Sequence, residues 1–194
     1  QYRKEEFFNI ILGTDYYINP QNVITLSGFY AYEAEDQPSN TNVQQFQNQT
    51  QLISEWNRNE VTTAGNPKYQ YEFIYKRDFL DDEDHDLIFS ATGNLFSKEQ
   101  SSEFFNTTVL GPGAFDDQQT RTFFRESVHT FKLDYTHPFG DYWTAEGGFQ
   151  YSSNDVSNDY EIKDDVEGVW VINPGFTNVF EFTQNVLGLY AITA

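Results

Sequence analysis

Hydrophobic and polar residues alternate with a period of two along several stretches of this chain. Between residues 121 and 137, Phe131 and Leu133 alternate with Lys132 and Asp134, and a Pro-Phe-Gly-Asp turn joins this run to a second alternating run. Successive side chains of a β-strand point to opposite sides of the sheet, so each run predicts a strand with one apolar and one polar face. The apolar face is rich in aromatic rings. This pattern is typical of strands with lipid on one side and water on the other.

The same alternation recurs along the chain and predicts seven strands joined by turns and polar connections. The predicted strands are about residues 6–18, 23–32, 68–79, 86–96, 121–137, 142–152 and 180–194. Long polar loops are predicted at about 33–67, 98–119 and 153–178, although 51–63 could be strand that continues beyond the apolar band. The facing of the last strand is ambiguous, because Leu187 and Leu189 alternate with Val186, Tyr190 and Ile192.

The order of the connections predicts the fold. Short turns follow the first, third and fifth strands, and long polar segments follow the second, fourth and sixth, which is typical of an up-and-down outer-membrane barrel. We therefore predict an all-β fold, an antiparallel up-and-down meander of about seven strands that forms an arc of a larger transmembrane outer-membrane β-barrel. Single-chain barrels normally have an even number of strands, and both ends of the sequence fall beside or inside alternating runs. We expect the whole of residues 1–194 to be partial barrel, a segment of a longer polypeptide.

The alternation also assigns side chains to the lumen or to lipid. The candidates for the water-filled lumen are charged: Glu72, Lys76, Lys132, Asp134 and Glu146. The candidates for the lipid side or its interfaces are aromatic or aliphatic: Phe8, Leu12, Tyr16, Leu26, Tyr71, Phe73, Phe89, Phe131, Leu133, Tyr135, Trp143 and Phe149. Tyr and Trp near strand ends would form the interfacial girdles of such a barrel. The alternative is that these rings form the core of a soluble sandwich.

Composition narrows the possible functions. Aromatic residues make up 18% of a chain that is only 38% hydrophobic, and the formal net charge is −19. Nucleic-acid binding needs a basic surface, so this charge argues against it. There is no cysteine, and neither a nucleophile elbow nor a phosphate-binding loop is present. We expect no enzymatic activity, no cofactor and no metal site.

Three features could suggest a metal site but favour simpler explanations. The acidic turn at residues 80–86 lacks the glycine and distal glutamate of a calcium loop, which favours a solvated turn. The acids of residues 153–178 could bind divalent ions near lipopolysaccharide or simply keep the surface hydrated, and the second explanation is favoured. The three histidines, His85, His129 and His137, are separated by strands and turns, which argues against a metal triad.

Several motifs resemble a known family. Leu133-Asp-Tyr-Thr-His-Pro-Phe-Gly140 followed by Glu146-Gly-Gly-Phe149 resembles a hairpin of the Bacteroidota outer-membrane β-barrel family related to TonB-dependent receptors. Residues 180–191 resemble the next strand, with Gly188 where that pattern has alanine, and residues 71–90 resemble the preceding hairpin. The resemblance implies a segment of a large, plugged barrel in the bacterial outer membrane. This sequence contains no plug and no TonB box.

Two functions remain open. The first is a barrel segment of a TonB-dependent-receptor-like protein for substrate uptake or for envelope transport or assembly. Its partners would be outer-membrane lipid, the rest of its own barrel and plug, and TonB and surface lipoproteins through the parent protein. The alternative is a soluble all-β binding module, for carbohydrate or a similar ligand, with aromatic platforms.

Overall fold

The computed structural model describes residues 3–79, 84–112 and 116–193, without the side chain of residue 141. Most of the acidic turn predicted at 80–86 lies outside the described residues, as does residue 194 of the last predicted strand. The described part contains one short 3₁₀ helix, Gly140–Tyr142. No helix in these ranges is long and apolar enough to cross a membrane.

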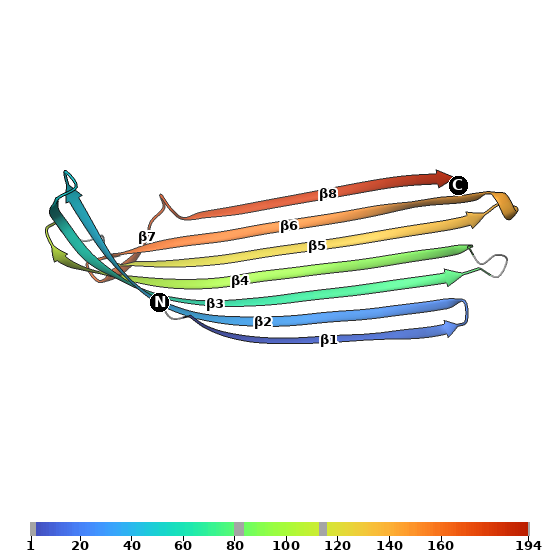
Figure 1. Ribbon diagram of the computed structural model, residues 1–194, viewed down its shortest axis with the longest axis horizontal. Coiled ribbons are helices and arrows are strands. Elements are labelled where there is room, and N and C mark those ends of the chain that lie inside the picture. The colour runs from blue at the N-terminus through green and yellow to red at the C-terminus, as the bar shows by residue number, and fades with distance from the viewer. Residues whose placement is uncertain (1–2, 80–83, 113–115, 194) are drawn as a thin grey trace.

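The strands form a single antiparallel sheet in chain order (Figure 1). They are β1 (Lys4–Asn19), β2 (Asn22–Gln47), β3 (Gln51–Asp78), β4 (Asp86–Leu110), β5 (Gln118–Pro138), β6 (Thr144–Val166), β7 (Val169–Ile172) and β8 (Asn178–Thr193). The short β7 pairs with the far end of β6, and β8 pairs with the rest of β6. β1 and β8 therefore lie at opposite edges of an unclosed sheet. This arrangement confirms the predicted all-β meander and its arc-like form.

The three segments predicted as long loops are mostly strand, and that part of the prediction was wrong. Residues 33–67 continue β2 and β3, residues 98–110 continue β4, and residues 153–166 continue β6. The β2–β3 and β6–β7 connections at this end are tight turns. Asn48 and Gln49 have φ of 50° and 64°, and Glu167 and Gly168 have φ of 54° and 84°. These left-handed conformations are typical of tight hairpin turns.

Polar cross-strand pairs hold the extended hairpins together without an apolar core. Asn40 donates to Asn59 at 2.5 Å, and Asn42 donates to Asn57 at 3.0 Å, across β2 and β3. Each such pair satisfies side-chain donors and acceptors while the backbone ladder continues, so a polar sequence still forms strand. A prediction based on apolar alternation alone ends these strands too early.

In the part of the chain that the structure describes, the sheet has no second layer to bury its apolar side chains. Within the described ranges only three hydrophobic residues are buried, Ala31, Ala64 and Ala91. Large apolar side chains remain exposed instead, including Ile11 at 71% and Leu189 at 77%. A soluble sandwich buries its aromatic face between two sheets, so this arrangement contradicts the soluble binding module. The apolar surface requires lipid or another protein against it.

Candidate functional site: two chemically distinct faces of one sheet

The strand register places every side chain on one of two faces. Directly paired residues of antiparallel strands point to the same side of the sheet. A row across β3 to β8 runs through Phe73, Ala91, Phe131, Tyr151 and Leu187. We call this side the Phe131 face and the opposite side the Lys132 face.

The register separates the predicted lipid residues from the predicted lumen residues. Eleven lipid candidates lie on the Phe131 face: Phe8, Leu12, Tyr16, Leu26, Tyr71, Phe73, Phe89, Phe131, Leu133, Tyr135 and Phe149. All five lumen candidates lie on the Lys132 face: Glu72, Lys76, Lys132, Asp134 and Glu146. Trp143 is in neither set, because it follows the 3₁₀ turn and precedes β6, where it is 63% exposed. The register also resolves the last strand: Leu187 and Leu189 lie on the Phe131 face, and Tyr190 lies on the Lys132 face.

The apolar part of the Phe131 face has the dimensions of a membrane span. We call it the aromatic band; in β4 it covers residues 87–95. A tilted transmembrane strand needs about 9–11 residues, so a span that begins beside the short turns ends near Leu95. Tyrosines flank the band at both ends, with Tyr16, Tyr75 and Tyr135 beside the short turns and Tyr30, Tyr32 and Tyr69 at the other end. Tyrosine is enriched at both membrane–water interfaces.

Two tyrosines fill spaces left by glycines on neighbouring strands. The Tyr71 ring lies where a side chain at Gly93 would be, and its hydroxyl is 2.9 Å from Nδ1 of His129. The Tyr190 ring covers Gly148 in the same way, and its hydroxyl donates to Asp134. These contacts require glycine at 93 and 148, because a Cβ at either position would overlap the ring.

Polar contacts connect the Lys132 face alongside the aromatic band. Lys132 Nζ lies 2.8 Å from Asp134, which also accepts the hydrogen bond from Tyr190. Ser27 donates to Glu72 at 3.2 Å across β2 and β3. This face therefore presents charged and hydroxyl groups at the same depth at which the opposite face presents hydrocarbon.

A match to a protein family explains why one face is apolar and the other polar. A family model described as "Outer membrane protein beta-barrel family" matches residues 77–194, more than half of the chain. The chain belongs to this family. It is therefore a barrel protein of the bacterial outer membrane, and the predicted localisation is confirmed. No curated protein matches the chain.

In an outer-membrane barrel protein, the two faces of the sheet contact different surroundings. Strands of such barrels alternate residues that face lipid with residues that face the interior. We assign the aromatic band to lipid and the Lys132 face to the interior, an assignment that remains a prediction for each residue. The unpaired edges of β1 and β8 are the positions at which further strands would close the sheet, because open edges do not occur within the hydrocarbon region.

A buried carboxylate lies on the Lys132 face beyond the aromatic band. Glu35 is 8% exposed; Asn66 donates to its Oε1 at 2.7 Å and Arg3 donates to its Oε2 at 3.1 Å. Lys98 Nζ lies 3.9 Å from Oε1. Burial raises the pKa of Glu35, but the hydrogen bond from Asn66 and the charges of Lys98 and Arg3 outweigh it and lower the pKa below its usual range. The sequence did not reveal this cluster, because residues 33–67 are predicted as a loop.

Two of the three histidines come together beside the short turns. His137 Nδ1 lies 3.2 Å from His85 Nε2, and the Tyr135 hydroxyl lies 2.9 Å from the same atom of His85. Their separation in the sequence concealed this proximity, while His129 lies in the middle of β5. Among the described residues, no three His, Cys, Asp or Glu side chains are grouped so that they could hold a metal ion.

Proposed function

We propose that this chain is part of the wall of a TonB-dependent-receptor-like barrel that takes up substrate, or that transports or assembles envelope components. We also propose that the parent protein belongs to the Bacteroidota branch of such barrels and is not an enzyme. The observation that carries the proposal is the charged Lys132 face, with the Lys132–Asp134–Tyr190 contacts alongside the aromatic band. A polar interior surface is what an aqueous or plugged lumen requires.

The open edges support a barrel larger than this arc. β1 and β8 are at opposite ends of the strand order and are not paired with each other. Additional strands are then needed for closure, and barrels of about 22 strands enclose a plugged lumen. The hairpin sequences of residues 133–149 and 180–191 resemble those of TonB-linked barrels, which favours this class over a small closed barrel. The proposed partners are the rest of the barrel, a plug, TonB and surface lipoproteins.

The charged wall offers a direct test of energy-dependent function. This segment contains no cysteine, so Asp134→Cys introduces a single reactive thiol into it. If TonB acts on the parent protein, the plug rearranges when the inner membrane is energised. We expect a membrane-impermeant maleimide to label residue 134 severalfold faster in energised cells than after addition of a protonophore.

Two controls make this experiment decisive. Glu99→Cys lies on the opposite face, beyond the aromatic band and more than half exposed, and its labelling should not depend on energy. Labelling at residue 134 should also lose its energy dependence in a strain without TonB. Equal labelling at 134 with and without protonophore would contradict a TonB-driven role and would favour a passive barrel.

A further inference from the structure

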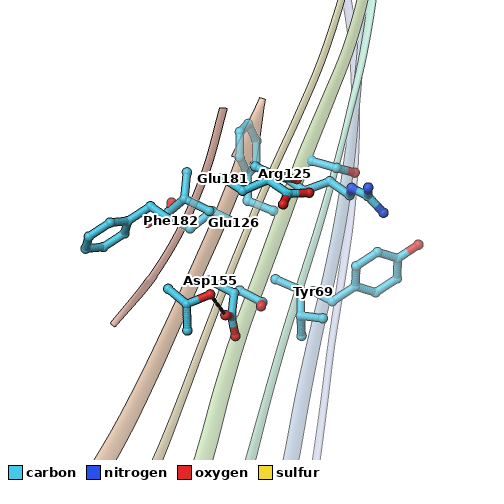
Figure 2. Close-up of a pocket in the computed structure, with 13 residues that line it drawn as sticks. Tyr69, Arg125, Glu126, Asp155, Glu181 and Phe182 are labelled. Atoms are coloured by element: carbon cyan, nitrogen blue, oxygen red, sulfur yellow. Dashed lines mark hydrogen bonds between the residues drawn. The ribbon is translucent and has the colours of Figure 1, made fainter. Parts of the chain in front are cut away.

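A pocket of about 560 Å³ opens at the distal end of the aromatic band. Most of its side chains belong to two adjacent rows of the Phe131 face. The row nearer the band contains Leu95, Ser127, Asp155 and Thr183, and the next contains Ser97, Arg125, Ser157 and Glu181. Tyr69 lies in the first row, opposite Leu95. In Figure 2, Arg125 and Glu181 lie at one level of the strands, and Tyr69 and Asp155 lie at the next.

The depth of the pocket places it at a membrane boundary. A span of about 9–11 residues that begins at Leu87 ends at residues 95–97 of β4, within these two rows. One row closer to the short turns, Gly93 lies beside the polar His129, Ser153 and Asn185, and the next row is fully apolar. A lipid whose chains cover the aromatic band would therefore place its headgroup in this pocket.

The charged side chains of the pocket favour one class of lipid headgroup. Arg125 is exposed and packs over the Phe123 ring at 4.8 Å. Within the described ranges, neither Arg125 nor Glu181 forms an ion pair with another side chain. Asp155 accepts hydrogen bonds from Thr183 at 2.7 Å and from Ser153 at 3.4 Å, one on each oxygen, and retains further acceptor capacity. Glu126 also lines the pocket, but the register places it on the Lys132 face. On the Phe131 face, one guanidinium therefore lies beside two carboxylates, which complements a group that carries one phosphate and one ammonium.

We propose that this pocket binds a zwitterionic phosphoethanolamine headgroup of a membrane lipid. Arg125 binds the phosphate through charge-assisted hydrogen bonds. The ammonium donates to Asp155 and Glu181, and the hydroxyls of Ser97, Ser127 and Ser157 complete a polar lining. A trimethylammonium headgroup has no N–H to donate, and an anionic headgroup without an amine leaves both carboxylates unpaired. The proposal rests on the membrane position of the chain and not on the transport function.

Lipid retention by the full-length protein tests the proposal. Native mass spectrometry of the detergent-solubilised protein would measure the binding of phosphatidylethanolamine, phosphatidylcholine and phosphatidylglycerol with identical acyl chains. We expect phosphatidylethanolamine to bind about tenfold more tightly than the other two, equivalent to about 1.4 kcal/mol. A fourth arm, lipid A with or without an attached phosphoethanolamine, identifies whether a phospholipid or a glycolipid carries the headgroup.

Matched variants separate this pocket from general lipid adhesion. Arg125→Gln and Glu181→Gln should each reduce phosphatidylethanolamine binding to the level of phosphatidylcholine, and Ser157→Phe should do the same by filling the cavity. Arg121→Gln is the control: Arg121 lies on the same strand and face, outside the pocket, and pairs with Glu99 at 3.0 Å. Equal retention of all three lipids, or equal losses in the Arg121 and Arg125 variants, would overturn the proposal.

Discussion

The half of the sheet beside the short turns and the half beyond the aromatic band differ in which face carries most of the aromatic side chains. Beside the short turns, aromatic and aliphatic side chains occupy the Phe131 face, and the charges lie on the Lys132 face together with aliphatic residues such as Ile11, Ile74 and Ile88. Beyond the aromatic band, the Phe131 face is mainly polar, and its acids include Glu99, Glu103, Asp155, Asp159, Glu161 and Glu181. Several aromatic rings lie on the Lys132 face there, including Trp56, Phe96, Phe104, Phe124 and Tyr160, while Phe105 and Phe123 stay on the Phe131 face.

This inversion is not caused by a slip in strand pairing. The β4–β5 and β5–β6 ladders run through both halves without a bulge. In β4 the large apolar side chains change face between Leu95, on the Phe131 face, and Phe96, on the Lys132 face. A strand that leaves the bilayer exchanges lipid for water on its outer face, so polar residues become favourable there while the pairing continues. We therefore predict that the membrane boundary lies at the inversion.

A charge at the centre of the aromatic band should have the largest effect. Phe131 occupies the middle row, and Phe131→Arg would place a cation at mid-bilayer, at a cost of about 2–4 kcal/mol. Urea titration of the protein in lipid vesicles would measure the loss of folding free energy.

The opposite face supplies the control for this change. Thr92→Arg introduces the same side chain one position away in the adjacent strand, on the Lys132 face opposite Glu72. Its cost should be well below that of the Phe131 variant. Equal costs on the two faces would remove the distinction between lipid and interior.

The sequence predicted the strands well within the aromatic band and poorly beyond it, and both outcomes have the same physical reason. Alternation of Phe89 and Phe131 with polar neighbours reveals a strand only while one face is apolar. Beyond Phe96 the phase of the alternation inverts, and in residues 33–67 it is almost lost, so strand was mistaken for loop. The Glu35 cluster could not be predicted, because Arg3, Asn66 and Lys98 are brought together only by strand pairing.

Removal of a glycine under a tyrosine should have the next largest effect. A Cβ at Gly148 would meet the Leu133 carbonyl oxygen and the Tyr190 ring, so Gly148→Ala forces a backbone or ring shift that costs about 1–3 kcal/mol. At Gly28→Ala the added methyl would lie 3.9 Å from the carbonyl oxygen of Gln70, an ordinary contact, and stability should change little. The same vesicle titration would compare them, and an equal loss in both would show that the tyrosine contact is unimportant.

At low pH, the part of the sheet beyond the aromatic band should lose stability before the aromatic band does. The pKa of Glu35 is lower in the folded protein than its usual value of 4.5, so its contribution to stability is complete above that value and is lost as the pH falls through the folded pKa. Hydrogen exchange of the amides near Glu35 and Asn66 should accelerate in that range, while amides around Phe131 change little. In Glu35→Gln this pH dependence should disappear. Its persistence would assign the effect to other acids.

Spin-label accessibility along β5 tests the central claim most directly. Nitroxides placed singly from residue 118 to residue 135 would be relaxed by oxygen, which concentrates in hydrocarbon, or by a water-soluble nickel complex. We predict that labels at 131, 133 and 135 respond to oxygen while those at 130, 132 and 134 do not, and that labels at 119, 121 and 125 respond to nickel. Preferential nickel accessibility at 131 and 133 would contradict the assignment of the aromatic band to lipid.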